Sequence, residues 1–151
     1  MSAIDLGPRF RQLNETLWVG PQISVEDIDR AADQGFARII CNRPDGEDPG
    51  QPPIADIAAA AEARGLEFTS IPVTTGFSEE MVEDMADALD GNGRPVLAYC
   101  RSGNRSTLLS SLAQASRGAD PETLDRQAAQ AGYSIDAVRP AVDALSARSN
   151  G

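Results

Sequence analysis

One cysteine of the chain lies where an oxyanion could bind. Cys100 directly follows the short apolar run Pro95–Tyr99 and precedes a polar loop that ends in Arg105. The run is typical of a buried strand, and Ser106 opens a helical pattern, so the loop is predicted to lie at a helix N-terminus. Unpaired backbone N–H groups and the helix dipole favour negative charge there. Cys100 is therefore predicted to be present largely as a nucleophilic thiolate.

The residues around Cys100 suit a tetrahedral anion. Arg105 supplies a planar, permanently charged fork for phosphate or a similar group. Ser106 either donates a hydrogen bond to the thiolate when it leaves or caps the helix. Arg101 is expected to point to solvent and to tune the local field. The residues predicted to bind the substrate in the loop are Arg101, Ser102, Gly103 and Asn104.

The composition excludes several kinds of site. The chain has no histidine, and all 13 of its cationic residues are arginine. A Ser-His-Asp triad, a Cys-His pair and a histidine-based metal site are therefore impossible. The net charge of −10 and the lack of a basic stripe argue against nucleic acid as a partner. The predicted site needs no metal and no organic cofactor.

The length and the cysteine count define the broad class. The 151 residues are predicted to form a single domain, 1–151, that can bury a core. Apolar runs are too short to span a bilayer, and the N-terminus has no signal-peptide pattern. We therefore expect a cytoplasmic protein without a membrane partner. Two cysteines are too few for a disulfide scaffold.

Short strands alternate with amphipathic helices along the chain, which predicts an α/β fold with a mostly parallel central sheet. The strands are expected at Leu17–Gly20, Ala37–Cys41, Leu66–Ile71 and Pro95–Tyr99. A polar loop is expected from Asn42 to Pro53. The helices are expected from Ser24 to Gln34, after Pro53 through Arg64, from Ser78 to Leu89, from Ser106 to Ser116 and from Asp120 to Ala131, with a last one that begins between 134 and 139. Ser24, Ser78 and Asp120 have the residue type of N-caps.

Two residues at the end of the second strand have two interpretations each. Cys41 is most simply a core residue. Its alternative is a reversible disulfide with Cys100, because adjacent parallel strands could bring both thiols to one end of the sheet. Arg43 either reaches the bound anion or forms an ion pair with the acidic loop beside it.

The loop and the segments before it resemble two enzyme groups. The loop length, with four residues between Cys100 and Arg105, is similar to that of rhodanese sulfurtransferases. The order of segments is similar to that of dual-specificity phosphatases, and resembles most closely the phosphatase-like domain family of beta-lactamase-hydrolase-like proteins. The resemblance covers roughly residues 13–135 and rests on Asn42-Arg43-Pro44-Asp45-Gly46-Glu47, Ile71-Pro72-Val73 and Tyr99-Cys100-Arg101-Ser102-Gly103-Asn104-Arg105-Ser106.

The resemblance implies a tyrosine-phosphatase-like fold and a hydrolase that acts on a phosphorylated small molecule or a phosphoprotein. Cys100 attacks phosphorus, the loop amides and Arg105 hold the equatorial oxygens, and water hydrolyses the thiophosphate intermediate. The usual acidic residue is missing from the loop Thr74–Phe77. Asp45 is predicted as the catalytic acid, with Glu47 as an alternative. Slow turnover with a preference for activated aryl phosphates is expected.

Two other functions fit the same residues. A sulfurtransferase would carry a persulfide on Cys100, and a non-catalytic module would only bind anions or phosphorylated ligands. Acidic residues of the segment after Ser78 are predicted to form a solvated helix surface rather than a metal site: Glu79, Glu80, Glu83, Asp84 and Asp87. The oligomeric state is left open by the sequence.

Overall fold

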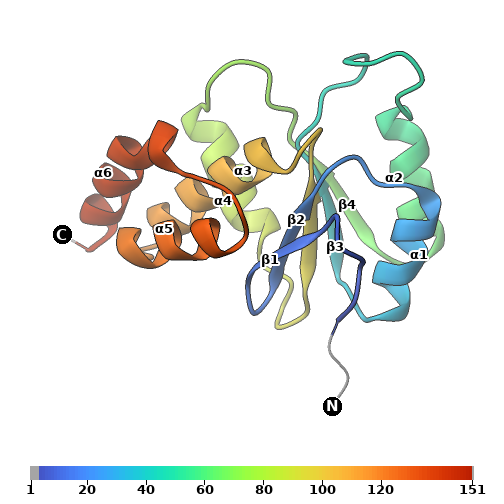
Figure 1. Cartoon of the computed structure of the whole chain (residues 1–151), viewed down its shortest axis with the longest axis horizontal. Helices are drawn as coiled ribbons and strands as arrows, with labels where there is room; N and C mark the ends of the chain where they lie inside the picture. Colours follow the sequence, from blue (N-terminus) through green and yellow to red (C-terminus); the bar gives the residue numbers. More distant parts are fainter. Residues whose placement is uncertain (1–3, 151) are drawn as a thin grey trace.

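The four predicted strands and one further strand build one mostly parallel sheet in the computed structural model, which describes residues 4–150 (Figure 1). The strands are β1 Arg11–Asn14, β2 Leu17–Gly20, β3 Arg38–Cys41, β4 Glu67–Ser70 and β5 Val96–Tyr99. Their order in the sheet is β1-β2-β5-β3-β4. β1 runs antiparallel to β2, and the other neighbours are parallel. The expected α/β class is confirmed.

Helices cover both faces of the sheet. They are α1 Val25–Asp33, α2 Ile54–Ala63, α3 Glu79–Ala88, α4 Asn104–Ser116, α5 Pro121–Gln130 and α6 Arg139–Asn150, with a short 3₁₀ turn, η1, at Asp136–Val138. Figure 1 shows α1 and α2 on one side and the other helices on the opposite side. The connections between parallel strands are helical, as parallel pairing requires.

The central strand β5 is apolar throughout because helices cover the sheet on both faces. Leu97 packs in the apolar cluster under α1 and α2, whereas Ala98 packs in the cluster under α3, α4, α5 and α6. Successive strand residues point to opposite faces, so a strand that is covered on both sides must be apolar throughout. Trp18 and Phe36 meet edge-to-face in the first cluster, with ring centroids 5.5 Å apart.

The predicted helix starts are confirmed at three positions. Ser24 accepts a hydrogen bond from the backbone of Asp27 and forms the capping box. Ser78 and Asp120 likewise accept from the third residue of their helices. Each cap satisfies an N–H group that has no partner within the helix, which fixes where the chain turns into it.

Two elements differ from the prediction. β1 was not expected, because its sequence, RQLN, lacks a continuous apolar pattern. It forms as an edge strand in which Leu13 is the one buried residue. The helix after the cysteine loop begins at Asn104 rather than at Ser106. Gly103, in the left-handed region with φ of 96°, turns the chain early enough to start α4 two residues sooner.

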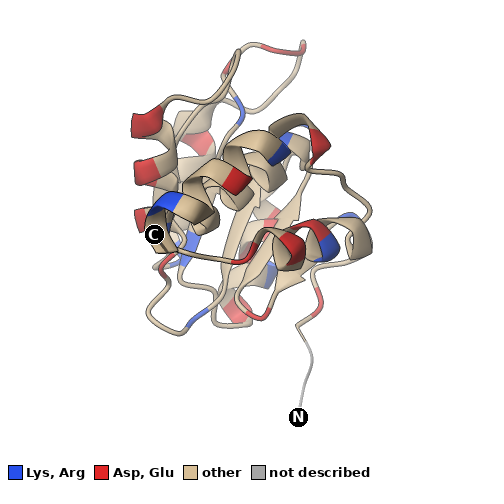
Figure 2. Ribbon diagram, turned by 90° about the vertical axis from the view of Figure 1, so that its left-hand side faces the viewer, with Lys and Arg blue, Asp and Glu red and all other residues tan. Residues whose placement is uncertain are grey.

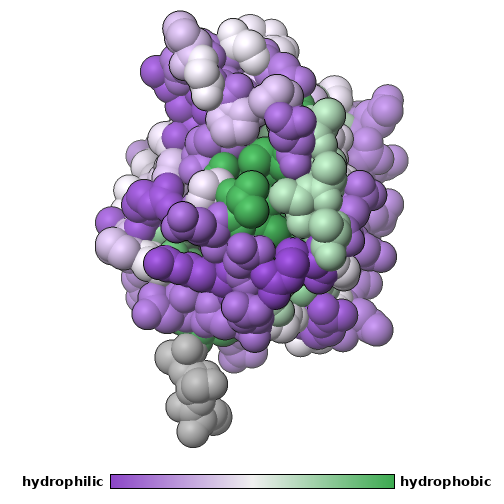
Figure 3. All heavy atoms as spheres, turned by 90° about the vertical axis from the view of Figure 1, so that its right-hand side faces the viewer, coloured by the Kyte–Doolittle hydropathy of each residue, from purple (hydrophilic) through white to green (hydrophobic). Residues whose placement is uncertain are grey.

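The outer surface carries the negative charge. Acidic residues gather along α3 (Figure 2), and those predicted to form a solvated face are all exposed there. The α1–α2 side has an apolar patch ringed by polar side chains (Figure 3). Val25, at the start of α1, is 56% exposed. Within residues 4–150 no helix has the length and apolarity needed to cross a membrane.

Candidate active site

Three polar loops meet at the carboxyl edge of the sheet. They follow β3, β4 and β5, which are adjacent and parallel, so their carboxyl ends lie together. Ligand sites of open α/β sheets form at this edge. The three loops are 42–53, 71–78 and 100–103. The first two contain two of the segments that carry the family resemblance, and the third lies within the segment Tyr99–Ser106.

Cys100 lies at this edge of the sheet, directly after the last residue of β5. Its backbone N–H donates to the Gly20 carbonyl at 3.2 Å, which continues the pairing of β5 with β2 for one residue. The side chain is fully buried, and its Sγ accepts a hydrogen bond from the Gly103 N–H at 3.0 Å. A backbone N–H directed at sulfur stabilises negative charge on it. One amide of the loop, that of Gly103, is therefore directed at the sulfur.

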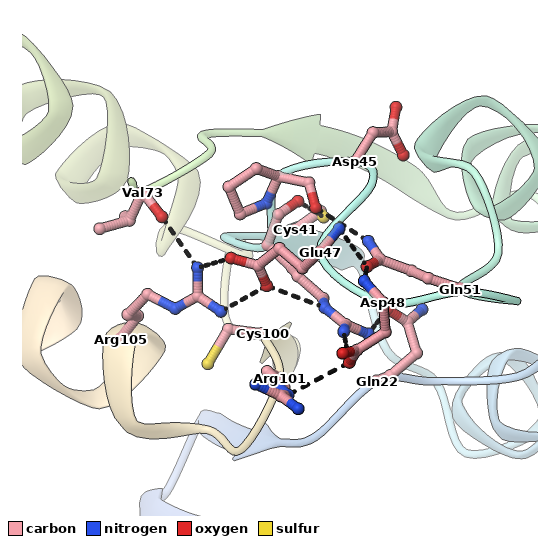
Figure 4. A network of polar contacts seen from close by, with 12 residues as sticks. Gln22, Cys41, Asp45, Glu47, Asp48, Gln51, Val73, Cys100, Arg101 and Arg105 are labelled. Carbon is pink, nitrogen blue, oxygen red and sulfur yellow. Dashed lines mark hydrogen bonds and ion pairs between the residues drawn. The ribbon is translucent and has the colours of Figure 1, made fainter. Parts of the chain in front are cut away.

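Arg105 is held along one edge of its guanidinium by two partners. Its Nη1 donates to Glu47 Oε2 at 2.8 Å and to the Val73 carbonyl at 2.9 Å, and its Nη2 donates to Glu47 Oε1 at 2.8 Å. A guanidinium has five N–H groups. These three contacts therefore leave the Nε–H and one Nη2–H, which share the other edge. The Cys100 sulfur faces that edge in Figure 4. A tetrahedral anion at Cys100 can thus be bound by a fixed two-donor fork.

Glu47 is an ionised partner of arginine rather than a proton donor. Hydrogen bonding to Arg105, with a further contribution from Arg43, lowers its pKa from 4.5 to about 2. Glu47 in turn raises the pKa of Arg105, and the charge of Cys100 contributes in the same direction. Since a general acid must be protonated near neutral pH, Glu47 does not fit that role. It orients Arg105 instead.

Arg43 lies within an ion-pair network and is not free to bind an anion. It is buried, and its three guanidinium nitrogens donate to Glu47, Gln22 and Asp48. The ion-pair interpretation of Arg43 therefore describes the structure, and the anion-binding one does not. Arg101 is 65% exposed in its side chain and pairs through Nε with Asp48 at 3.2 Å. It faces solvent beside the loop, as expected.

The remaining loop residues shape the backbone. Ser102 Oγ accepts from the Asn104 N–H at 3.3 Å, and Thr107 Oγ1 donates to the Gly103 carbonyl at 2.8 Å. Ser102 and Asn104 have exposed side chains, whereas Gly103 is buried. These contacts place the first turn of α4 directly behind Cys100.

Ser106 does not cap the helix, because α4 begins two residues earlier with Gly103 as its N-cap. The capping interpretation is wrong for this reason. Ser106 Oγ is fully buried and has no hydrogen-bond partner among residues 4–150. A buried hydroxyl without a partner is costly. Its presence in the first turn of α4 is consistent with a role at the adjacent cysteine loop.

The assignment of Asp45 as the catalytic acid is not supported. Asp45 Oδ1 accepts a hydrogen bond from the Ile54 N–H at 2.8 Å, and its carboxylate points away from Cys100 in Figure 4. Pro53 is the N-cap of α2 and has no side-chain donor or acceptor. Asp45 therefore satisfies an N–H at the start of α2, a tertiary contact that the sequence spacing does not reveal.

Asp45→Ala is expected to cost about 1 kcal/mol of folding stability, the usual effect of losing a helix cap, and to leave the turnover of an aryl phosphate within about twofold of wild type. Chemical denaturation and steady-state assays measure the two effects. A loss of a hundredfold or more in the rate at unchanged stability would restore Asp45 as the acid.

Cys41 and Cys100 are both free thiols. Cys41 pairs in register with Tyr99 and packs on the same side of the sheet, in the cluster under α1 and α2. Cys100 is one residue beyond Tyr99, so alternation directs its side chain to the other side. Cys41 Sγ donates to the Arg43 carbonyl at 3.2 Å, and burial raises the pKa of its thiol. The core interpretation of Cys41 therefore describes this structure, which contains no disulfide between the two.

Sequence reasoning missed the groups that hold Arg105. Glu47 was considered only as a proton donor, and the Val73 carbonyl was not considered as a partner of Arg105. A usable signal exists, because residues after β3 and β4 must lie beside the loop after β5 in this strand order. Which of these residues binds Arg105, however, depends on the tertiary structure.

Glu47→Gln is expected to destabilise the fold by about 1 to 2 kcal/mol at neutral pH, since it removes the charged partner of two arginines, one of them buried. The pKa of Glu47 is depressed in the folded chain, so its contribution is complete above the ordinary pKa of 4.5 and is lost as the pH falls towards about 2. The stability difference between wild type and variant should therefore shrink between these two pH values. Urea denaturation across this range tests it; a pH-independent difference contradicts the ionic role.

Comparison with known families agrees with this geometry. Residues 9–117 match the model of the family described as "Beta-lactamase hydrolase-like protein, phosphatase-like domain". A beta-lactamase hydrolase-like protein of Agrobacterium fabrum is 34% identical over 108 residues, which are 71% of this chain and 25% of that protein. One from Xylella fastidiosa is 33% identical over 107 residues, 70% of this chain and 25% of that protein. The chain thus spans about a quarter of the length of these curated relatives.

Solved structures share the fold. A protein of Neisseria meningitidis Z2491 that is provisionally assigned as a phosphatase is 36% identical, with a TM-score of 0.74 over 89% of this chain and 96% of that one. Pseudomonas aeruginosa TpbA, solved in complex with pTyr, is 16% identical, with a TM-score of 0.66 over 99% of this chain and 95% of that one. The second likeness concerns the fold alone. By its sequence match over residues 9–117, the chain belongs to the phosphatase-like domain family of beta-lactamase hydrolase-like proteins.

Proposed function

We propose that the chain is a cysteine-dependent phosphatase that hydrolyses phosphate monoesters. One observation carries the proposal: the buried Cys100 sulfur, the Gly103 N–H at 3.0 Å and the unused edge of Arg105 converge at one point. Family membership and the phosphatase-like fold support the same reaction class.

The proposed reaction has two steps. In the first, the Cys100 thiolate attacks phosphorus, an S–P bond forms, and the P–O bond to the leaving group breaks. The loop N–H groups and Arg105 hold the equatorial oxygens while their charge is redistributed. In the second, water attacks phosphorus and the S–P bond breaks. Ser106, whose hydroxyl has no other partner within residues 4–150, is assigned to donate a hydrogen bond to the departing thiolate.

The substrate preference follows from the carboxylates around the site. Glu47 is ionised and bound to two arginines, and Asp45 is turned towards α2. The leaving oxygen therefore receives no proton from either residue. Phosphates with weakly basic leaving groups, such as aryl phosphates and phosphotyrosine, should react fastest because they need the least protonation. The pTyr complex of TpbA makes phosphotyrosine a suitable probe.

A sulfurtransferase is the second candidate, favoured by the same lack of an acid. In this reaction the Cys100 thiolate attacks the outer sulfur of thiosulfate, the S–S bond breaks, and sulfite leaves with the electron pair. Sulfite needs no proton to leave, so neither Asp45 nor Glu47 is required. The four-residue spacing between Cys100 and Arg105 is also that of the rhodanese-like loop.

Two assays on the same wild-type preparation separate these functions. The phosphatase is expected to release the phenol from an aryl phosphate in a reaction that vanadate, a phosphate mimic, inhibits competitively. It should form no thiocyanate from thiosulfate and cyanide. Thiocyanate formation without phosphate hydrolysis would replace the phosphatase by the sulfurtransferase, and anion binding without either reaction would leave a binding module.

A further inference from the structure

Tyr133 reaches the cysteine loop from a part of the chain that lies beyond the matched family segment, residues 9–117. It follows α5, where Gly132 adopts a left-handed conformation with φ of 90°. The Gly132 N–H donates to Ala129 O at 3.0 Å and the Tyr133 N–H to Ala128 O at 2.9 Å. These two bonds form a Schellman cap, which fixes the Tyr133 backbone at the end of α5.

The hydroxyl of Tyr133 holds a particular peptide unit. It donates to the Ser102 carbonyl at 3.0 Å. The N–H of the same peptide belongs to Gly103 and donates to Cys100 Sγ at 3.0 Å. In a trans peptide the C=O and the N–H point in opposite directions. The bond from Tyr133 on the outside therefore keeps the N–H directed inward at the sulfur.

Gly103 makes this external bond necessary. Its φ of 96° is accessible because it has no Cβ, and a Cβ built there would lie 2.2 Å from the Tyr133 hydroxyl oxygen. The glycine thus admits both the backbone turn and the phenol. A glycine also restricts the adjoining peptide least, so local sterics alone hold the Ser102–Gly103 unit weakly. If that unit rotated, a carbonyl oxygen would face the thiolate in place of the N–H.

The phenol is also placed to remain a donor. Tyr133 is half-buried, and burial, followed by the nearby charge of Cys100, raises the pKa of its hydroxyl. It therefore keeps its proton at neutral pH.

We propose that Tyr133 is a positioning residue of the Cys100 site, whose hydroxyl fixes the Ser102–Gly103 peptide so that the Gly103 N–H points at the cysteine sulfur and the bound oxyanion. The role rests on the proposed anion chemistry at Cys100. It assigns a function at the site to the segment between α5 and η1, which the family match does not cover.

Tyr133→Phe removes the hydroxyl and keeps the ring, so it tests this role without opening a cavity. The Gly103 amide signal in a proton–nitrogen correlation spectrum should shift or broaden in the variant. The dissociation constant of inorganic phosphate and the kcat/KM for an aryl phosphate should each worsen by roughly tenfold, which corresponds to the net contribution of the one hydrogen bond that holds the peptide. Ser134→Ala is the matched control. Its hydroxyl lies in the same segment and accepts from the Asp136 N–H at 3.2 Å, away from the cysteine loop.

The outcomes are separable. An unchanged Gly103 signal together with wild-type phosphate affinity in Tyr133→Phe overturns the positioning role. Equal losses in Ser134→Ala also overturn it, because they would reflect loosening of the segment as a whole. If wild type hydrolyses no aryl phosphate, the phosphatase proposal fails. The Gly103 signal and phosphate binding still decide the role of Tyr133, since neither depends on turnover.

Discussion

Cys100→Ser is expected to lower the rate of aryl phosphate hydrolysis by roughly four orders of magnitude, to the background level. A serine hydroxyl is a much weaker nucleophile than a thiolate unless a general base removes its proton. The chain contains no histidine, and the nearby acidic residue Glu47 is committed to arginine. Steady-state kinetics on the purified variant measure the loss.

Cys41→Ala is the matched control for this result. Cys41 is a second buried thiol, it packs in the cluster under α1 and α2, and its replacement removes no group from the cysteine loop. We expect its rate to stay within about twofold of wild type, with a loss of about 1 kcal/mol in stability for the smaller side chain. Equal rates for wild type and Cys100→Ser would remove Cys100 from the mechanism.

Arg105→Lys is expected to reduce kcat/KM by roughly a hundredfold to a thousandfold, the range found when a transition-state donor is lost. A lysine keeps the charge, but it cannot bind Glu47 and Val73 along one edge and an anion along the other. The loss should appear in kcat as well as in KM, because the equatorial oxygens are held most tightly in the transition state.

Arg101→Lys gives the comparison for Arg105. Arg101 belongs to the same loop but is exposed and pairs with Asp48, so only a few-fold effect is expected. Kinetics of both variants at several salt concentrations should show a salt-sensitive change for Arg101→Lys and a largely salt-insensitive one for Arg105→Lys. Equally small losses in the two variants would mean that charge, and not the oriented fork, matters.

Much of the fold can be predicted from local sequence because the signals are local. The apolar run Pro95–Tyr99 corresponds to β5, Val96–Tyr99, and Ser24 and Ser78 cap their helices as predicted. The edge strand β1 could not be predicted, because it is held by pairing with β2 rather than by its own pattern. The start of α4 was misplaced since Gly103 turns the chain before the helical pattern becomes recognisable.

The residues of the candidate site likewise fall into those that local sequence reveals and those that only tertiary contacts reveal. Cys100 and Arg105 are recognisable from one short segment, because a strand, a polar loop and a helix follow each other there. Glu47 is 58 residues from Arg105 in sequence, and Tyr133 is 31 residues from Ser102. Contacts over such separations depend on strand order and on the packing of α5. Asp45 was assigned to the chemistry because its tertiary contact at α2 was hidden in the same way.

The mass of the covalent adduct on Cys100 tests the central claim most directly. Wild-type protein would be mixed with an aryl phosphate, quenched rapidly and digested, and the peptide that contains Cys100 analysed by mass spectrometry, with Cys100→Ser and thiosulfate-treated wild type in parallel. We predict a phosphoryl group on Cys100 of the wild type with the aryl phosphate and none in the variant. An unmodified Cys100 during phosphate release, or an adduct that is found only as a persulfide after thiosulfate, would contradict the phosphatase assignment.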